Sequence, residues 1–508
     1  MKRILYLIIG LLAAVSEAEA QQTGKVTRTF FPDPDIEIGT PAFQKKHGFT
    51  GYSEMMDYLH GMITEHPDMM SLEIVGRTQK GRDIPMVRIS RPGQADKLRV
   101  LYLGSVHGNE HGGTEGLLYF MDRMTHNDTL SRLLDKIDFY IMPMVNIDGS
   151  EVNKRATDNN TDLNRNQTLL TIPEAQTMQR VASTVRPHVF IDFHEYKPLR
   201  ASYEDIAGKL VTNPNDFMFL WSSHPNVAPS LTKVLQKHFI PEAREMAERE
   251  GLTNHTYFTT KSDKGDVIFN IGGASPRSSS NSMALRGAVS MLMEVRGIGL
   301  GRTSYKRRVN TVCMLAEQFA RTAFDHAGEV ARAVDEAGTD NRDLAVAFRS
   351  KRQENYPVEM IDILGCRKIT LDVDARIAPE CEVTLSRPRP SAYYLSKDEV
   401  RAVETLRRFG VEMETLAEPR VAEVETYTVT RANESYEPVG GILPLAVATD
   451  LTRRRMTIPA GSVRIPMEQP LGNLVGTLLE PESPNGFVNY RVIDAEKGKD
   501  LTIYRETK

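Results

Sequence analysis

Residues 99–110 read RVLYLGSVHGNE, an apolar run that leads through a glycine to a histidine and a glutamate. Branched and aromatic side chains followed by a glycine predict a buried β-strand over 99–103 that ends in a turn. His107 and Glu110 are three residues apart on that turn, so their side chains can converge on one point. Imidazole nitrogen and carboxylate oxygen both suit zinc, and a catalytic zinc site needs three protein ligands. Alone, the pair is a weak signal, because two exposed polar loop residues have the same pattern.

A second apolar run also ends in a histidine. Residues 187–194 read PHVFIDFH, which predicts a buried strand over 188–193 with His194 at its carboxyl end. Ligand groups gather at the carboxyl ends of parallel strands, so His194 is the candidate for the third ligand. His188 and His111 are the competing histidines, and we expect both to lie outside the ligand set.

Strands alternate with helices on either side of these two runs. This alternation predicts an α/β fold with a mixed, mostly parallel sheet and helices on both faces. The expected strands are 71–75, 84–89, 99–103, 137–145 and 188–193, and the expected helices begin at Ser53 and cover 113–124 and 173–185. A polar turn joins the first two strands, which are therefore expected to form a hairpin.

Two further polar segments carry candidate side chains. Asp162 could accept the free ring N–H of a zinc-binding histidine and so determine its tautomer. Arg165, three residues later, has a planar fork that suits a carboxylate, although an ordinary polar loop is the alternative. Glu294 lies inside the apolar run 291–297, where a carboxylate is costly unless it is paired or functional. It could be a general base, and an ion pair with an arginine is the alternative.

In this order the motifs resemble the zinc carboxypeptidase family over roughly residues 51–300. The matching positions are His107, Glu110, Asn146 to Gly149, Arg155, Asp162, Asn164 to Asn166, His194 and Glu294, together with an early hairpin over 74–82. Each motif is weak by itself, but six ordered motifs at compatible spacing carry far more weight. Two histidines and one glutamate are also the zinc ligands of carboxypeptidase A.

The resemblance implies one zinc ion and the hydrolysis of a peptide bond that releases a C-terminal amino acid. The implied zinc ligands are His107, Glu110 and His194. Asp162 is implied to accept a hydrogen bond from the ring nitrogen of His107 that does not bind zinc. Glu294 is implied to take a proton from the zinc-bound water and return it to the leaving amine. Arg155 is implied to polarise the scissile carbonyl and to stabilise the oxyanion.

The same resemblance implies that Asn164 and Arg165 hold the terminal carboxylate of the substrate. One departure concerns this part of the site. The family commonly has a mobile tyrosine upstream of the glutamate, but residues 272–283 contain no tyrosine. Tyr257 is the nearest candidate. Arg277, which lies within this stretch, is expected to be a surface arginine.

Three classes of function therefore compete. The first is a zinc exopeptidase, which the complete ordered set of motifs favours. The second is a zinc amidase acting on cell-wall stem peptides or N-acyl amino acids, which the missing tyrosine and an export signal favour. The third is a metal-free binding module, although such a module would be expected to have lost some of the ligands.

The amino-acid composition excludes several classes of protein. Of 508 residues, 40% are apolar and 26% charged, as in ordinary globular proteins. A net charge of -4 leaves no basic excess for binding nucleic acid. Three cysteines exclude a disulfide-dense scaffold and a four-cysteine zinc site. Oligomeric state stays open.

The start of the chain predicts export. Residues 1–20 combine Lys2 and Arg3, an apolar run over 5–15 and a small-residue pattern at 18–20, as in a signal peptide cut after Ala20. The run is too short to span a bilayer, and no later stretch is apolar enough to do so. We expect a soluble protein, secreted or periplasmic.

The character of the sequence changes after residue 330. We expect a zinc carboxypeptidase-like catalytic domain over 21–330 and a smaller α+β domain of unknown role over 331–508. The expected strands of the second domain are 368–373, 421–430 and 456–465. Cys366 and Cys381 could form a disulfide in an oxidising compartment, and Cys313 is expected to be a buried thiol.

Overall fold

The computed structural model describes residues 23–92, 96–263, 266–439 and 441–507. The predicted signal peptide, residues 1–20, lies outside this part of the chain. Among the helices of the described residues, none has the length and apolar character that crossing a membrane requires.

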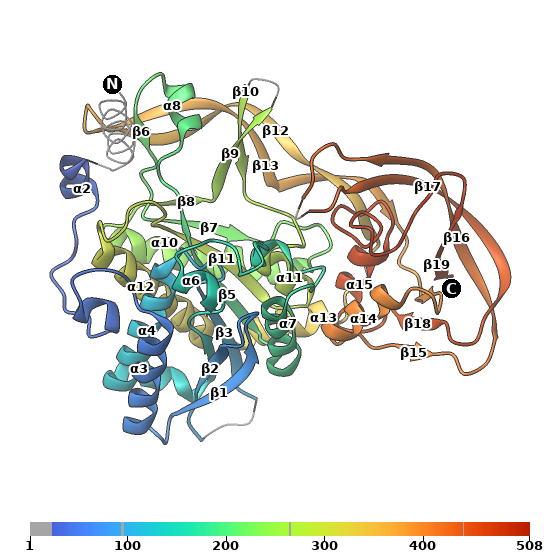
Figure 1. The fold of residues 1–508 in the computed structure, drawn as a ribbon, viewed down its shortest axis with the longest axis horizontal. Coiled ribbons are helices and arrows are strands. Elements are labelled where there is room, and N and C mark those ends of the chain that lie inside the picture. Colours follow the sequence, from blue (N-terminus) through green and yellow to red (C-terminus); the bar gives the residue numbers. More distant parts are fainter. Residues whose placement is uncertain (1–22, 93–95, 264–265, 440, 508) are drawn as a thin grey trace, which may run out of the picture.

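An eight-stranded sheet forms the centre of the larger part of the molecule (Figure 1). Its strands are β1 (Met70–Arg77), β2 (Asp83–Ile89), β3 (Leu98–Gly104), β4 (Ile137–Met142), β5 (Val189–Tyr196), β7 (Phe217–Trp221), β8 (Asn254–Thr256) and β11 (Val289–Arg296). The spatial order is β1-β2-β4-β3-β5-β11-β7-β8. Strands β4, β3, β5 and β11 are parallel neighbours, whereas β1 and β2 form an antiparallel hairpin and β7 runs antiparallel to β11. The predicted mixed, mostly parallel sheet is confirmed.

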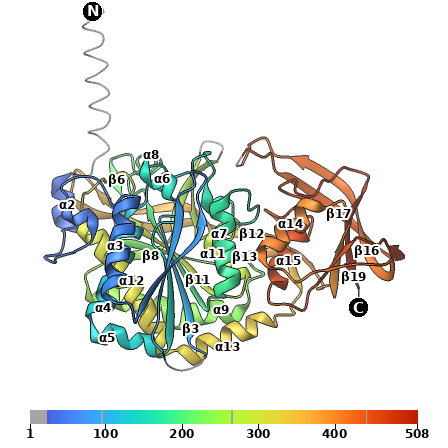
Figure 2. The same ribbon diagram turned by 60° about the horizontal axis from the view of Figure 1, so that its bottom comes forward.

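Helices cover both faces of this sheet. Helices α4 and α12 pack against each other on one face, and α7 and α11 lie on the other (Figure 2). The longer helices are α3 (Tyr52–Glu65), α4 (His111–His126), α7 (Pro173–Val185), α10 (Ile240–Arg249), α12 (Tyr305–Asp325) and α13 (Ala327–Gly338). The shorter ones are α2 (Gly24–Phe30), α5 (Asp128–Ser131), α6 (Ile147–Glu151), α8 (Ala201–Ala207), α9 (Pro229–Val234) and α11 (Ser279–Leu285), with single turns η1 (Pro41–Gln44), η2 (Arg132–Asp135), η3 (Leu163–Arg165) and η4 (Leu235–Phe239).

A five-stranded sheet contains the longest hairpin of the molecule, which arches over the larger part in Figure 1. Its strands are β6 (Val211–Thr212), β9 (Phe258–Asp263), β10 (Asp266–Ile271), β12 (Leu344–Asp362) and β13 (Arg367–Arg387). Strand β12 pairs with β6, and β13 pairs with β10. Hydrogen bonds of this sheet therefore cross residue 330, and the division of the chain at that residue stays a prediction.

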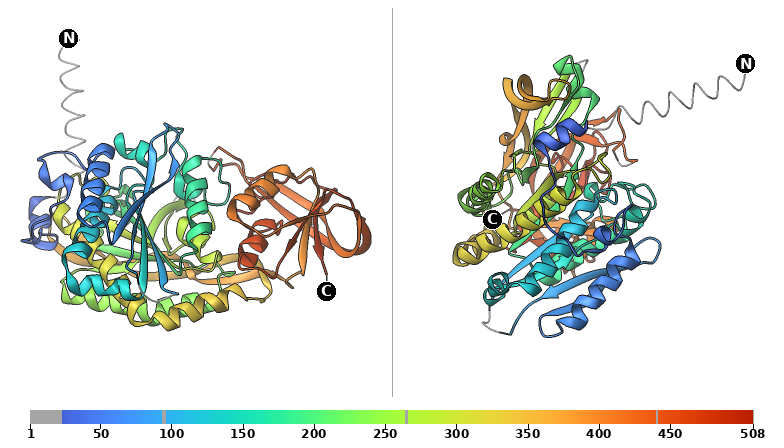
Figure 3. Two further views of the ribbon diagram at one scale, coloured as in Figure 1. Left: turned by 90° about the horizontal axis from the view of Figure 1, so that it is seen from below. Right: turned by 90° about the vertical axis from the view of Figure 1, so that its left-hand side faces the viewer.

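The C-terminal strands and helices form a lobe beside the larger part (Figure 3). Its elements are β14 (Ala392–Leu395), β15 (Glu414–Thr415), β16 (Arg420–Glu434), β17 (Leu445–Ile458), β18 (Val463–Pro466), β19 (Asp500–Glu506), α14 (Val400–Phe409) and α15 (Gly472–Leu479). The predicted strand over 456–465 is wrong, because β17 ends at Ile458 and a turn closed by Ser462 N–H on the Pro459 carbonyl precedes β18. The lobe meets α7 where the Ser183 hydroxyl donates to the Phe409 carbonyl at 2.9 Å.

The disulfide considered for Cys366 and Cys381 does not form. The three cysteines all lie among the described residues and are free thiols. Cys366 lies in the turn before β13 and Cys381 lies far along the same strand. A strand rises about 3.3 Å per residue, so the two thiols are tens of ångströms apart, whereas the Cα atoms of a disulfide are within about 7 Å. Cys313 is buried in α12, as predicted.

The turn after β3 packs against α6 with no space for a side chain at Gly108. A Cβ atom on Gly108 would lie 2.1 Å from the Gly149 carbonyl carbon and 2.2 Å from the Ser150 nitrogen. The Gly108 N–H also donates to the Arg155 carbonyl at 3.3 Å. Asn146 caps α6 by accepting from the Gly149 N–H at 3.0 Å. The backbone around 107–110 is therefore held against residues 146–155.

Gly108→Ala should lower the denaturant midpoint of unfolding. The atoms that the new methyl group meets are backbone atoms, so relief requires a backbone shift, and overpacking of this kind costs about 1–3 kcal/mol. Gly61→Ala is the control, because Gly61 is exposed in α3 and a Cβ atom there would meet nothing within 4 Å. That change should be neutral or stabilising by up to about 1 kcal/mol. Equal urea midpoints for the two variants would contradict the close approach.

Candidate metal centre

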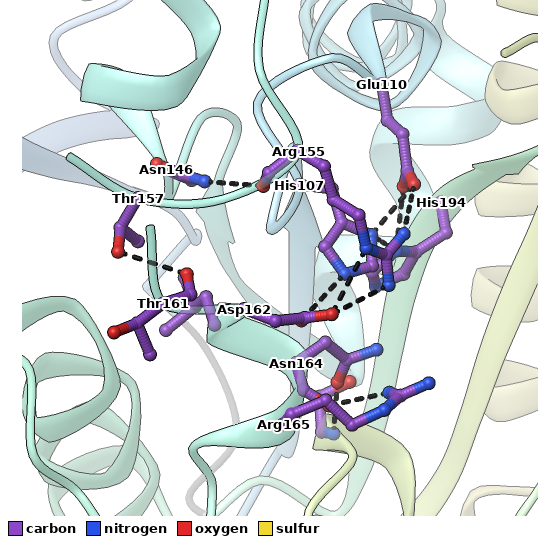
Figure 4. Close-up of polar contacts among 12 residues, drawn as sticks. His107, Glu110, Asn146, Arg155, Thr157, Thr161, Asp162, Asn164, Arg165 and His194 are labelled. Carbon is purple, nitrogen blue, oxygen red and sulfur yellow. Dashed lines mark hydrogen bonds and ion pairs between the residues drawn. The ribbon is translucent and has the colours of Figure 1, made fainter. Parts of the chain in front are cut away.

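Three of the predicted side chains meet at the carboxyl ends of β3 and β5. The two strands are parallel neighbours, with Gly104 opposite Phe193. His107 Nδ1 lies 2.8 Å from Glu110 Oε1, and His194 Nδ1 lies 2.8 Å from Glu110 Oε2 (Figure 4). The two Nδ1 atoms are 3.0 Å apart. All three side chains are buried.

This donor set fits a zinc ion. One ligand atom from each of the three side chains lies within 4.8 Å of the others. Two imidazole nitrogens and one carboxylate are a known ligand set for catalytic zinc, which leaves one position for water. The backbone N–H of Glu195 donates to Glu110 Oε2 at 3.0 Å and so orients the carboxylate.

Each imidazole has a carboxylate on its outer nitrogen. Asp162 Oδ1 lies 3.3 Å from His107 Nε2, and Asp192 Oδ2 lies 2.8 Å from His194 Nε2. An acceptor at Nε2 keeps a proton on that nitrogen, so Nδ1, which faces Glu110, is the nitrogen available to a metal. Asp192 was not predicted, although its position two residues before His194 puts both on one face of β5. The Ser279 hydroxyl donates to Asp192 at 2.5 Å.

Burial and neighbouring charges shift the pKa values of Glu110 and His194 in opposite directions. Burial opposes ionisation of Glu110, but electrostatic interactions and hydrogen bonds with His107 and His194 hold its pKa well below the ordinary value. Burial disfavours charge on His194, but Asp192 and Glu110 raise its pKa. Glu110 is therefore an anion at neutral pH, as a metal ligand must be.

Glu294 faces this cluster from β11. It stands directly opposite His194 in the parallel β5–β11 register, so the two side chains lie on the same face of the sheet. Burial, followed by the negative charge of Glu110, raises the pKa of Glu294 to about 7. Among the described residues, no hydrogen bond or ion pair engages its carboxylate, and the predicted alternative of an arginine partner is absent.

Arg155 lies at the edge of the same cluster. Its guanidinium is 3.1 Å from Asp162 Oδ2 and 3.5 Å from Glu110 Oε1. Burial works to lower the pKa of Arg155, but Asp162, Glu110 and Glu294 raise it. The cluster thus contains a permanently positive group beside its carboxylates.

Asn164 and Arg165 occupy η3, below the cluster in Figure 4. Asn164 Oδ1 accepts from the Ser279 N–H at 2.7 Å, which leaves the side-chain NH₂ group for another partner. Arg165 donates from Nη1 to the Asn164 carbonyl at 2.8 Å. Its guanidinium is exposed, and no carboxylate in the described ranges pairs with it.

Arg277 is not the surface residue that was predicted. It is buried, and its Nε donates to the Arg165 carbonyl at 3.0 Å. Its guanidinium lies 4.9 Å from the centre of the Tyr490 ring, and Nη1 donates to the Tyr490 hydroxyl. The long-range contact with Tyr490 explains the difference, because no local pattern around residue 277 indicates it.

Tyr257 is partly buried, and its phenol interacts electrostatically with Glu294 and Arg165. Burial, followed by the negative charge of Glu294, raises the pKa of its phenol, and the charge of Arg165 opposes that rise. The phenol of Tyr257 is therefore protonated at neutral pH and can donate a hydrogen bond.

The two competing histidines lie apart from His107, Glu110 and His194. His111 stacks on Phe49 with ring centres 4.0 Å apart, and its Nε2 lies 3.0 Å from Asn153 Oδ1. His188 accepts from the backbone N–H of Arg99 at 2.9 Å. Burial lowers the pKa of each histidine to about 4.

Sequence comparison identifies relatives of the chain. Residues 55–184 match the zinc carboxypeptidase family. Carboxypeptidase 2 of Trichophyton equinum is 26% identical over 442 residues, which cover 84% of this chain and 81% of that protein. A zinc carboxypeptidase of Saccharothrix mutabilis subsp. capreolus is 34% identical over 144 residues, covering 27% of this chain and 32% of that protein.

A metallo-carboxypeptidase structure from Burkholderia cenocepacia is 20% identical, with a TM-score of 0.42 over 55% of this chain and 70% of that chain. A score of that size adds nothing to the assignment, which depends on the sequence matches. By these matches, the chain is similar to carboxypeptidases over most of its length, and residues 55–184 match the zinc carboxypeptidase family.

Proposed function

We propose that this protein is a zinc-dependent exopeptidase that removes the C-terminal residue of a peptide. The observation that carries the proposal is the convergence of His107, Glu110 and His194 in front of Glu294, a buried carboxylate without a partner in the described chain. The similarity to zinc carboxypeptidases supports the same reaction. The amidase and binding-module alternatives are not favoured by this combination.

The catalytic zinc ion would be held by Nδ1 of His107, Nδ1 of His194 and a carboxylate oxygen of Glu110. When bound, zinc supplies a Lewis acid for the scissile carbonyl and lowers the pKa of a coordinated water. The outer carboxylates of Asp162 and Asp192 maintain the tautomers that this binding requires.

Glu294 is the proposed general base and acid. A carboxylate with a pKa near neutrality can accept the proton of the attacking water and then donate it to the leaving amine. Arg155 is the proposed partner of the oxyanion, because its charge is permanent and already lies at the edge of the cluster. The ion pair with Asp162 holds the Arg155 guanidinium in this position.

Asn164 and Arg165 are the proposed clamp for the terminal carboxylate of the substrate. A guanidinium can form two parallel hydrogen bonds with a carboxylate, and that of Arg165 has no carboxylate partner in the described chain. Tyr257, whose phenol feels the charges of Glu294 and Arg165, is proposed to donate to the bound substrate. It would compensate for the absence of a tyrosine in residues 272–283.

We also propose that the protein is exported, with residues 1–20 as its signal peptide and residues 21–330 as the catalytic domain. The positive start, the short apolar run and the small residues at 18–20 support export. The C-terminal domain, residues 331–508, would support the substrate-binding loop, because Tyr490 contacts Arg277, which in turn holds the Arg165 backbone.

His194→Ala should abolish both the zinc that survives dialysis and the peptidase activity, because one of three ligands is lost. Elemental analysis and a peptide assay on the same sample test this, with circular dichroism as the check on folding. His188→Gln is the matched control, since His188 also lies at an end of β5 but outside the ligand set. A His194 variant that keeps wild-type zinc and activity would exclude the ligand assignment.

Glu294→Gln should keep the zinc and lose turnover, because the amide has nearly the same size but cannot exchange a proton. Loss of a general base typically lowers kcat by about 10²–10⁴-fold. Glu73→Gln, an exposed change on β1, should retain wild-type activity. Turnover within a few-fold of wild type would remove Glu294 from the mechanism.

Wild-type enzyme should cleave a free peptide far better than its C-terminally amidated form. An unmade hydrogen bond to a charged group costs about 1.5–3 kcal/mol, or roughly 10- to 150-fold in kcat/KM. Arg165→Ala should remove most of this preference, and Arg165→Lys should restore only part of it, since lysine keeps the charge without the planar fork. If wild type cleaves both peptides equally, the clamp is unused and the amidase alternative gains.

A further inference from the structure

A further cluster of histidines and carboxylates lies on the helical layer, away from the sheet ends. It consists of His238, Glu242, His326 and Glu329. His238 lies in η4, a π-helical turn, and Glu242 lies four residues later in α10. His326 lies between α12 and α13. Turns of π-helix are rare and occur frequently at functional sites.

One oxygen of Glu242 faces nitrogens of both rings. Its Oε1 is 2.8 Å from His326 Nε2 and 3.9 Å from His238 Nδ1. The two rings stack, with centres 3.6 Å apart and planes inclined by 21°. Ligand atoms from the three residues lie within 4.8 Å of one another, so two nitrogens and one oxygen surround one point.

Outer contacts orient these groups toward that point. Glu329 Oε2 lies 3.1 Å from His238 Nε2, so it can accept the proton there and leave the Nδ1 lone pair toward Glu242. Lys237 Nζ also donates to Glu329 Oε2, at 2.8 Å. The Thr322 hydroxyl donates to Glu242 Oε2 at 2.5 Å, so Oε1 is the oxygen that faces the two rings.

The cluster is separate from the candidate metal centre. Arg308, near the start of α12, pairs at 2.5 Å with Glu195, the residue after His194. His326 follows the other end of α12. The helix between Arg308 and His326 rises about 1.5 Å per residue, or roughly 27 Å in all. No side chain can therefore serve both sites.

We propose that His238, Glu242 and His326 form a second metal site, which binds a divalent transition metal of the zinc class. The donor set of two imidazoles and one carboxylate, with water as the remaining ligand, suits such an ion. His326 and Glu242 are partly exposed, with 26% and 28% of their side-chain surface accessible, so metal and water can reach the site from solvent. Bound metal would tie η4 and α10 to the α12–α13 junction and stabilise the helical layer.

Zinc titration of the full-length protein tests this site directly. Protein dialysed to its tightly held zinc should take up one further equivalent of Zn²⁺ in calorimetry, with a rise in thermal midpoint. The double variant His238→Gln/His326→Gln should lose that equivalent and the rise. His60→Gln, an exposed histidine change on α3, should keep both. Circular dichroism checks that all three proteins are folded.

Three outcomes would overturn the proposal: wild type takes up no further equivalent, the double variant takes up as much as wild type, or the His60 control loses as much as the double variant. The last outcome would indicate adventitious binding to surface histidines. Co²⁺ in place of Zn²⁺ gives an independent readout, since the visible spectrum of a nitrogen-coordinated cobalt site should be absent from the double variant. The site does not depend on the proposed peptidase function, because every readout here is metal binding.

Discussion

The parallel pairing of β3 with β5 is the constraint on which the candidate metal centre depends. It sets the two strand ends side by side, so that a turn after one strand and a residue within the other supply imidazoles 3.0 Å apart. Glu110 bridges them, and the Glu195 N–H holds Glu110 from behind. The next parallel pairing, of β5 with β11, brings Glu294 level with His194. A one-residue shift of either register would turn these side chains to opposite faces.

The pKa values of Glu110 and Glu294 are shifted in opposite directions because the two carboxylates have different hydrogen-bond partners. Glu110 has two imidazoles beside it, which lower its pKa despite burial. Glu294 is buried without such a partner and near the charge of Glu110, and its pKa rises to about 7. Groups whose environments separate their pKa values in this way suit different tasks, here a fixed anion and a group that exchanges protons.

Contacts with the C-terminal lobe reach the candidate substrate clamp. Tyr490 lies against Arg277, and Arg277 holds the carbonyl of Arg165. The loop of η3 is thus supported by residues more than a hundred positions further along the chain. This gives the lobe a physical connection to the site.

The local pattern of the sequence determined much of the site. An apolar run that ends in polar ligands marked β3 with His107 and Glu110, and the run before His194 marked β5, because burial on both faces of a parallel strand requires continuous apolar residues. Only the tertiary structure decided which distant groups meet. It brought Asp192 and Ser279 together, buried Arg277 against Tyr490 and separated Cys366 from Cys381. It also placed His326, between α12 and α13, beside His238 and Glu242. Such contacts depend on how elements pack, and periodicity within one element carries no information about its partners in other elements.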